Sequence, residues 1–372
     1  EGFDLSRGRL MRVKLIRKGE QEHELLYTMH HIISDGWSMG VVVKEMGELY
    51  DSYRKGEESG LEELEVQYAD YAKWQREWLR GEELEREMSY WREQLGGELA
   101  VMELPVKKGR KQRPGLSGWQ ELIEVKNELA DGLKKLNRQE GVTMFMTLLS
   151  AYGILLSPYA RQEEVRVLTL NAGRARAETK GLIGFFLNNL VLQVDLRGNP
   201  TFRELLARVR AMALGAYAHQ ELPFSKLIEE LHPERTLSRT PLGQAVLNFQ
   251  PFERTTFELK GLTISPFNIP AKLMPFELAM NVTDLGDEML VSLQYNTDLF
   301  YASTIKGMLG SFETLLSAIQ DRPDLRLDQL KEIVEKSNAQ MQVEERENIN
   351  RARLQKFAAI KRSPAGEAKK AL

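Results

Sequence analysis

Between Glu121 and Ile319 the chain alternates between two hydrophobic periods, and this alternation decides its fold class. Apolar residues at every second position, or in short runs, are typical of strands, whereas apolar residues at every third or fourth position are typical of helices. The pattern predicts strands at 121–125, 165–170, 190–196, 244–249, 257–264, 276–282 and 289–295, and helices at 127–139, 143–156, 201–217 and 303–319. Interleaved strands and helices predict a mixed α/β fold, in which helices pack on the faces of a sheet.

The N-terminal part of the chain shows the same mixture. Apolar-rich segments at Leu10–Ile16 and Glu24–His30 flank the polar turn Lys18–Glu22, and this arrangement predicts a hairpin. The helix period then returns at 38–54 and, after a linker rich in glycine and glutamate, at 68–95. We therefore expect a second, smaller unit of strands and helices at the start of the chain.

Residues 105–117 interrupt both periods with prolines, glycines and a basic cluster, and they are the best candidate for a domain boundary. We divide the chain into a first lobe (1–105), a linker (106–118), a second lobe (119–325) and a charged tail (326–372). The tail has sparse apolar positions and is expected to be a solvated helix that ends in a basic run. Such a tail is either a frayed terminus or a docking element for another protein.

The charge balance and the lack of cysteine exclude several classes of protein. The 51 basic and 54 acidic residues give a net charge of −3, so there is no overall positive field for a nucleic acid or an anionic membrane. Without cysteine the chain holds no disulfide, zinc–thiolate site, iron–sulfur cluster or cysteine nucleophile. No apolar run approaches the ~20 residues of a membrane span, so a cytoplasmic location is expected. Since the 372 residues open at Glu1 rather than at methionine, we expect them to belong to something longer.

Two of the five histidines, His30 and His31, are adjacent between the expected hairpin and the expected helix. If the strand continues through His31, the two rings point to opposite faces and cannot share one site. One ring should then be buried and structural, and the other should face a cleft. The same geometry disfavours a metal site, because ligands on one face of a strand are two residues apart.

A histidine at the end of a strand, followed by Asp35, Gly36 and a helix, is a suitable general base. The imidazole titrates near neutral pH, and a strand end opens towards solvent. Asp35 could accept hydrogen bonds from turn amides or pair with a buried arginine, and so hold the loop in shape. The residues alone leave a catalytic and a structural role for the histidine pair equally open.

The string Met29–Ser38 resembles the His-His-x-x-x-Asp-Gly signature of condensation domains of non-ribosomal peptide synthetases, which have the chloramphenicol-acetyltransferase-like fold. Four later segments resemble the family's further motifs, in the family's order. They are Tyr68–Gln75, Ile183–Asn188, His219–Leu227 and Ser238–Leu242. The resemblance covers most of residues 3–312 and implies a two-lobed domain in which each lobe is a mixed sheet with packed helices.

The resemblance assigns roles to the residues of the first motif. His31 matches the family's catalytic histidine, which lies in a tunnel between the lobes, whereas His30 matches a structural histidine. Asp35 matches a structural aspartate that pairs with an arginine of an earlier motif. Gly36 matches a glycine whose missing side chain leaves the channel open.

Three further residues are candidates for the substrate channel, namely Trp37, Ser38 and Asn188. The pair Trp37-Ser38 resembles the subtype that joins two L-configured residues. Asn188 matches a site-facing asparagine, although a core or strand-capping role is an equal alternative. Arg174 and Arg176 are expected to brace the segment that joins the lobes rather than to be catalytic.

The family's first two motifs would lie before Phe3 and are absent, so the resemblance implies an incomplete first lobe. The arginine expected to pair with Asp35 would be missing too, which would leave the carboxylate without a partner and the His31 loop less rigid. No carrier or adenylation sequence follows the last motif, so the acceptor carrier would bind in trans. Residues 331–362 are the candidate docking helix, and deletion after Asp328 is expected to leave the fold intact.

The resemblance implies amide bond formation between two carrier-bound substrates. The amine of an aminoacyl thioester on one carrier would attack the acyl or peptidyl thioester on another. The domain itself would bind no cofactor, because the phosphopantetheine arms belong to the partner carriers, which an adenylation domain of the same assembly line would load. Whether His31 removes a proton or mainly orients the amine is open.

Three other functions remain as alternatives. The first is a non-catalytic module of the same fold that recruits carriers or enzymes. The second is a related acyltransferase that forms esters or amides with a soluble acceptor. Metal-dependent hydrolysis comes last, because of the strand geometry at the histidine pair.

Overall fold

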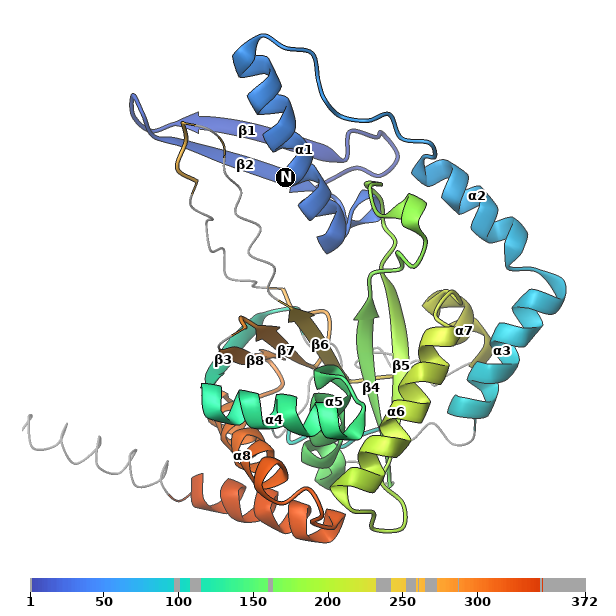
Figure 1. Ribbon diagram of the computed structural model, residues 1–372, viewed down its shortest axis with the longest axis vertical. Coiled ribbons are helices and arrows are strands. Elements are labelled where there is room, and N and C mark those ends of the chain that lie inside the picture. Colours follow the sequence, from blue (N-terminus) through green and yellow to red (C-terminus); the bar gives the residue numbers. More distant parts are fainter. Residues whose placement is uncertain are drawn as a thin grey trace, which may run out of the picture.

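The structure, a computed structural model, describes residues 2–96, 101–107, 115–159, 163–231, 242–251, 259, 261–264, 273–286, 288–341 and 343. Figure 1 shows a small part with a two-stranded sheet and a helix, and a larger part built on a six-stranded sheet. Helices α2 (Tyr68–Trp78) and α3 (Gly81–Leu95) run along one side of the molecule from the small part to the large one (Figure 1).

The small part begins with the predicted hairpin. Strands β1 (Met11–Arg17) and β2 (His23–Met29) pair antiparallel along their whole length. After a short turn follows α1 (Gly36–Lys55), which confirms the helix predicted at 38–54. The helix ends at Gly56, whose φ of 72° places it in the left-handed region that glycine adopts without strain.

The helical stretch expected at 68–95 is two helices rather than one. α2 ends at Trp78 and α3 begins at Gly81, whose positive φ of 55° interrupts the helix. α3 then packs into the core of the large part through Trp91 and Leu95, which are 2% and 1% exposed. The domain boundary after residue 105 remains a proposal, because α3 lies before it in the sequence and yet packs with the part of the chain that follows it.

The large part is built on a mixed sheet with the strand order β3-β8-β7-β6-β4-β5. Strands β4, β6 and β7 are parallel, and the other neighbours pair antiparallel. The strands are β3 (Gly118–Val125), β4 (Glu164–Asn171), β5 (Asn188–Asp195), β6 (Ala245–Pro251), β7 (Leu278–Asp284) and β8 (Met289–Asn296). The strand expected at 257–264 falls mostly outside the described residues; of those described, Leu259 and Leu262 form one isolated bridge.

Helices cover one face of this sheet and confirm the predicted mixed α/β class. They include α4 (Asn127–Glu140), α5 (Met144–Leu156), α6 (Phe202–Ala218), α7 (Phe224–Leu231) and α8 (Ala302–Asp321). α5 is the centre of the core, because every residue except Phe145 is buried. α5 contacts β4, α6 contacts β5, and α8 contacts β3 and β8.

The tail is helical over residues 327–341, but it is not solvated as expected. Leu330 and Val334 are 1% and 0% exposed and belong to the main core. Asn338 accepts a hydrogen bond of 2.8 Å from the Ser311 hydroxyl of α8. Apolar residues four apart lie on one helix face, so few of them are enough to bury the helix against α8. Deletion after Asp328 would therefore remove core residues, and the expectation that it leaves the fold intact is wrong.

Among the described helices, no single one is long and apolar enough to span a membrane. The segments 127–140 and 144–159 meet the length and composition requirement only when they are combined, and the chain bends by 105° between them.

Candidate active site

The two adjacent histidines lie in a turn rather than in a strand. β2 ends at Met29, and His31–Ile33 form one turn of 3-10 helix (η1) that leads into α1. The expectation that the strand continues through His31 is therefore wrong, and the strand argument for opposite faces does not apply. Neither ring is fully buried: His30 is half-buried and His31 is exposed.

The partners of the two rings distinguish them chemically. The Nδ1 atom of His30 accepts a hydrogen bond of 3.0 Å from the Ile32 N–H and so caps the turn. The Nδ1 atom of His31 lies 2.5 Å from the Ser34 carbonyl oxygen. Because a carbonyl oxygen can only accept, Nδ1 of His31 carries the proton, and its Nε2 is left with a lone pair. His31 is thus oriented to take up a proton at Nε2, whereas the basic nitrogen of neutral His30 is already used.

Asp35, four residues after His31, is held by a buried ion pair. One carboxylate oxygen lies 3.2 Å from Nη2 of Arg174, and the two side chains are 2% and 1% exposed. The carboxylate also accepts hydrogen bonds from the N–H groups of Ser38, at 2.8 Å, and Phe186, at 3.0 Å. The expectation of an unpaired Asp35 is therefore wrong, because Arg174, which follows β4, supplies the partner.

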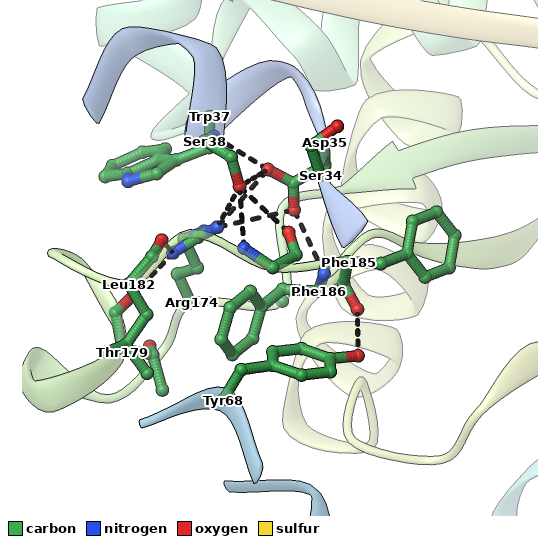
Figure 2. A network of polar contacts seen from close by, with 12 residues as sticks. Ser34, Asp35, Trp37, Ser38, Tyr68, Arg174, Thr179, Leu182, Phe185 and Phe186 are labelled. Atoms are coloured by element: carbon green, nitrogen blue, oxygen red, sulfur yellow. Dashed lines mark hydrogen bonds and ion pairs between the residues drawn. The ribbon is translucent and has the colours of Figure 1, made fainter. Parts of the chain in front are cut away.

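Ser38 links the same network to the segment before β5. Its hydroxyl oxygen lies 2.7 Å from the Asp35 carboxylate and 2.8 Å from the Gly184 carbonyl oxygen, and it accepts a hydrogen bond from Arg174. Figure 2 shows these groups converging from α1, from the loop after β4 and from the segment 182–186. Ser38 is 0% exposed, so the structure places this channel candidate inside the network.

The network sets the ionisation of Asp35. Burial alone would raise the pKa of this carboxyl group, but the hydrogen bonds from Ser38 and Phe186 and the charge of Arg174 outweigh it, and the pKa lies below its ordinary value of 3.8. Burial lowers the pKa of Arg174, and the charge of Asp35 opposes that change. Asp35 is therefore a charged anchor for the loop that carries His31.

Segment 184–186 approaches α2 closely. The Tyr68 hydroxyl donates a hydrogen bond of 2.8 Å to the Phe185 carbonyl (Figure 2). The Tyr68 ring lies where a side chain on Gly184 would be. The Arg174 guanidinium lies 4.1 Å from the centre of the Phe186 ring. Sequence reasoning did not single out Gly184, although a glycine between two large apolar residues is a signal for such a close approach.

Gly36 and Trp37 lie at the exposed start of α1. A Cβ atom on Gly36 would meet nothing within 4 Å, so the protein itself does not require glycine there. The Trp37 ring is 47% exposed, and its Nε1 donates a hydrogen bond of 2.9 Å to the Lys180 carbonyl. Both residues border open space, which is compatible with a channel at this end of the helix.

Asn188 fixes the loop between α6 and α7. Its amide nitrogen donates to the carbonyl oxygens of Gln220 and Leu222, at 3.0 and 2.8 Å, and its oxygen accepts from the Phe224 N–H at 2.9 Å. These three bonds use most of the side chain's hydrogen-bonding capacity. Asn188 is therefore fixed by the backbone around it and shapes the wall of the pocket described next.

A pocket of about 190 Å³ lies beside this network. Its walls come from α2, through Tyr68 and Tyr71, from the segment 185–188 and from residues 220–223. Burial raises the pKa of Tyr71 to about 12 and also raises the pKa of Glu221. Phe185 is one of the residues that line the pocket, and its ring contacts the His31 ring, edge-on at 5.2 Å between centroids. Phe185 thus touches both the pocket and His31.

His219, directly after α6, contacts α3 through its backbone and its ring rather than through a ring hydrogen bond. Its carbonyl oxygen accepts a hydrogen bond of 3.0 Å from Nε1 of Trp91, and its ring stacks on Tyr90 at 4.1 Å. Nδ1 lies 3.2 Å from a carboxylate oxygen of the buried Glu87 but without hydrogen-bond geometry. Ser238–Pro241 of the last motif lie outside the described residues.

Within the part of the chain that the structure describes, no group of three or more histidine, aspartate or glutamate side chains could hold a metal ion. The polar atoms around His31 are instead arranged as a rigid support for one imidazole.

A family model described as "Condensation domain" matches residues 1–342. The chain belongs to the condensation-domain family. Over 344 residues this condensation domain is 44% identical to part of a linear gramicidin synthase of Brevibacillus parabrevis, a match that covers 92% of this chain and 7% of that protein. It is 39% identical over 325 residues to a chondramide synthase of Chondromyces crocatus, with 87% of this chain and 8% of that protein covered.

Solved structures place the fold in the same family. The X-domain from teicoplanin biosynthesis is similar with a TM-score of 0.80 and 25% identity, covering 88% of this chain and 76% of that one. This match confirms the predicted chloramphenicol-acetyltransferase-like fold. Condensation domains are in general acyltransferase-type enzymes of multidomain synthetases, and they use substrates carried on the phosphopantetheine of partner domains. The condensation domain described here spans less than a tenth of the length of either synthetase.

Proposed function

We propose that this domain joins a donor acyl or peptidyl group to an acceptor aminoacyl group, each held as a thioester on a carrier domain. The acceptor amine attacks the donor carbonyl, the C–N bond forms and the C–S bond breaks. The amine loses one proton in this step, and the departing thiolate of the donor arm gains one. The products are an amide on the acceptor carrier and a free thiol on the donor carrier.

The observation that supports this proposal best is the hydrogen bond between Nδ1 of His31 and the Ser34 carbonyl. It leaves Nε2 as the only ring atom of His31 that can accept the amine proton. Because the hydrogen bond at Nδ1 already fixes the ring, His31 loses little conformational entropy when Nε2 accepts a proton. His31 at Nε2 then either removes the proton or stabilises the charged intermediate, and both roles require the same orientation.

The supporting residues act on His31 rather than on substrate. Asp35 and Arg174 tie the start of α1 to the loop after β4, and Ser38 ties it to Gly184. His30 caps the turn. Gly36 and Trp37 leave the N-terminal end of α1 open, and we assign them to the channel.

Donor and acceptor carrier domains and an adenylation domain are the proposed partners, and two L-configured residues are the proposed substrates. The tail is proposed to dock a carrier in trans only beyond Val343. The described helix at 327–341 already packs against α8 and is used by the fold.

Product analysis tests the proposed reaction. The chain would be mixed with a donor carrier and an acceptor carrier, each loaded with a defined aminoacyl-phosphopantetheine, and the acceptor would be analysed by mass spectrometry. We expect an acceptor arm heavier by one donor residue, and no such product when the donor is left out. An acceptor that remains unchanged, beside a folded chain and intact thioesters, would contradict the proposal.

One observation favours recruitment as a second candidate function. The X-domain in complex with OxyB, also from teicoplanin biosynthesis, is similar to this chain with a TM-score of 0.80 and 26% identity. If this domain recruits an enzyme instead of catalysing, it forms no product and binds a partner equally well with His31→Ala. A product that depends on His31 would decide for catalysis.

A further inference from the structure

The two faces of the six-stranded sheet differ in composition. One face consists of buried apolar residues under the helices, such as Leu247, Met280 and Leu293. The opposite face also has apolar residues such as Val246, but the register places many amide and hydroxyl side chains there, namely Gln120, Asn189, Gln193, Asn248, Gln250, Asn281, Thr283, Ser292 and Gln294. The edge of this second face borders solvent, because Gln120 and Gln250 are exposed.

Three of these amides, Asn189, Asn248 and Asn281, lie in one row across neighbouring strands, and we call them the amide row. Asn248 and Asn281 are register partners on β6 and β7. Leu168 of β4 is beside Val246 of β6, so Leu170 is level with Asn248. Leu170 is in turn the register partner of Asn189 on β5.

The amide row holds polar atoms that the protein does not use. Asn248 donates a hydrogen bond of 2.9 Å to Asn281. Among the residues that the structure describes, no hydrogen-bond partner is found for the remaining oxygen of Asn248, the nitrogen of Asn281 or the oxygen of Asn189, and these three atoms are buried. Each such atom costs stability, because it loses water and gains nothing in exchange. The paired asparagines together present one donor and one acceptor on adjacent strands, about 5 Å apart.

The row crosses the middle of β6 and β7 and reaches the start of β5, in the sheet that carries the candidate active site at one edge. The parallel strands β4, β6 and β7 end at one edge, where ligands of open α/β sheets usually bind. Arg174, which holds Asp35, follows the end of β4 by three residues. Asn189 follows Phe186, whose N–H also binds Asp35, by three residues. On the same face the residues preceding the row on β6 and β7, Val246 and Ala279, are apolar, whereas Gln294 and Gln120 lie level with Ala279 on β8 and β3.

We propose that the amide row binds secondary amide groups of the thioester-linked substrate. A secondary amide has one N–H and one C=O, which match the free oxygen of Asn248 and the free nitrogen of Asn281, while Asn189 offers a further acceptor. Two parts of a carrier-bound peptidyl thioester contain such groups, the peptide backbone and the pantetheine arm. This inference rests on the proposed function, since it assumes a carrier-bound substrate.

Equilibrium binding to unreactive analogues tests the inference without turnover. The reference probe is a dipeptidyl-pantetheine in which a methylene replaces the thioester sulfur, and its binding to the full chain would be measured by calorimetry. Asn248→Leu and Asn281→Leu keep the side-chain volume and remove the amide. We expect each to raise the Kd about 3- to 10-fold, the usual effect of losing one neutral hydrogen bond. Gln120→Leu, on the same face but exposed, should leave the Kd within about twofold.

Two further probes separate the sources of the amide. One has a plain acyl chain in place of the dipeptide, and the other keeps the dipeptide but ends in a butyl group in place of the arm. If the variants raise the Kd only of the acyl-chain probe, which keeps the arm, the row binds the arm. If they raise the Kd only of the butyl probe, which keeps the dipeptide, the row binds the peptide. Either result supports the inference. A wild-type chain that binds the reference probe no better than Asn248→Leu and Asn281→Leu would overturn it.

Thermal unfolding distinguishes substrate binding from a structural role. Each single variant breaks the hydrogen bond between Asn248 and Asn281, so the double variant Asn248→Leu/Asn281→Leu, which removes both partners, is the one whose Tm should equal or exceed that of the wild type. Variants that bind normally and unfold at a lower temperature would show that the amides only support the fold, and would overturn the inference. If binding depends on the row while no amide product forms with loaded carriers, the proposed function fails and the inference stands.

Discussion

At the scale of single residues, the site shows how two identical side chains acquire different chemistry. His30 and His31 are adjacent, yet one accepts a hydrogen bond from a backbone amide and the other donates one to a backbone carbonyl. The partner selects the tautomer, and the tautomer selects which nitrogen can work as a base.

This difference predicts opposite tautomers, which nitrogen NMR of a histidine-labelled chain can measure. In neutral solution His31 should carry its proton on Nδ1 and His30 on Nε2. His23, the exposed first residue of β2, serves as the reference for an unconstrained ring. Finding His31 protonated at Nε2 in the neutral ring would contradict the assigned geometry.

Asp35→Asn should destabilise the fold strongly, because it leaves the buried charge of Arg174 without its counter-charge. We expect the free energy of unfolding to fall by about 3 to 5 kcal/mol, measured by urea denaturation at neutral pH. In a double-mutant cycle, Asp35→Asn should lower the free energy of unfolding much less in the Arg174→Met background than in the wild type. Equal costs of Asp35→Asn in both backgrounds would show that the pair does not interact.

The same carboxylate predicts a dependence of stability on pH. The pKa of Asp35 in the folded chain lies below its ordinary value of 3.8, so the unfolded chain binds the proton first as the pH falls. The stabilisation is fully present above the unfolded pKa and is lost as the pH falls through the folded pKa. The difference in unfolding free energy between wild type and Asp35→Asn should therefore be constant at neutral pH and shrink below about pH 4. A difference that shrinks between pH 5 and 8 would point to another group.

At the scale of elements, hydrophobic period was enough to predict most helices and strands, and contacts between distant segments were not predictable. The alternation after Glu121 gave the sheet strands to within a few residues, because burial of one strand face imposes it. The break between α2 and α3 was missed because both helices keep the same period and only Gly81 marks the change. The prediction of a solvated tail helix was wrong because its few apolar residues seemed too few to form a buried face. They are enough because α8 packs against that face.

The tail helix gives a direct test of this correction. Leu330→Ala should lower the free energy of unfolding by about 2 to 5 kcal/mol, since the side chain is 1% exposed in the core. Val343→Ala, at a position that is 55% exposed, is the matched control and should change it by less than about 0.5 kcal/mol. Similar small effects of both changes in chemical denaturation would mean that the helix does not pack on α8.

The contact between α2 and segment 184–186 depends on a missing side chain. Gly184→Ala would push a methyl group into the Tyr68 ring and should cost about 1 to 3 kcal/mol. Gly40→Ala in the exposed part of α1 meets nothing within 4 Å and should be neutral or slightly stabilising. Thermal unfolding of the two variants compares them directly, and a Gly184→Ala chain as stable as the wild type would remove the basis for this close approach.

At the scale of the whole molecule, the candidate site is assembled from three separate regions of the chain. The sequence motif at 29–38 pointed to His31 and Asp35 as candidates, and the catalytic role of His31 stays a prediction. The partner of Asp35 was expected before residue 3, but it is Arg174. No local pattern shows that residues 139 positions apart share a buried ion pair. What the sequence could not show was therefore tertiary: which distant groups meet, and which side of the sheet they face.

The central claim is that His31 acts on the reacting groups, and the rate constant of amide formation tests it most directly. In a single-turnover reaction with loaded donor and acceptor carriers, His31→Ala should slow product formation about 10²- to 10⁴-fold, as expected for the loss of a general base. His23→Ala, which changes the exposed first residue of β2 at the strand end away from His31, should react at the wild-type rate. Amide formation by a folded His31→Ala chain at the wild-type rate would contradict the claim.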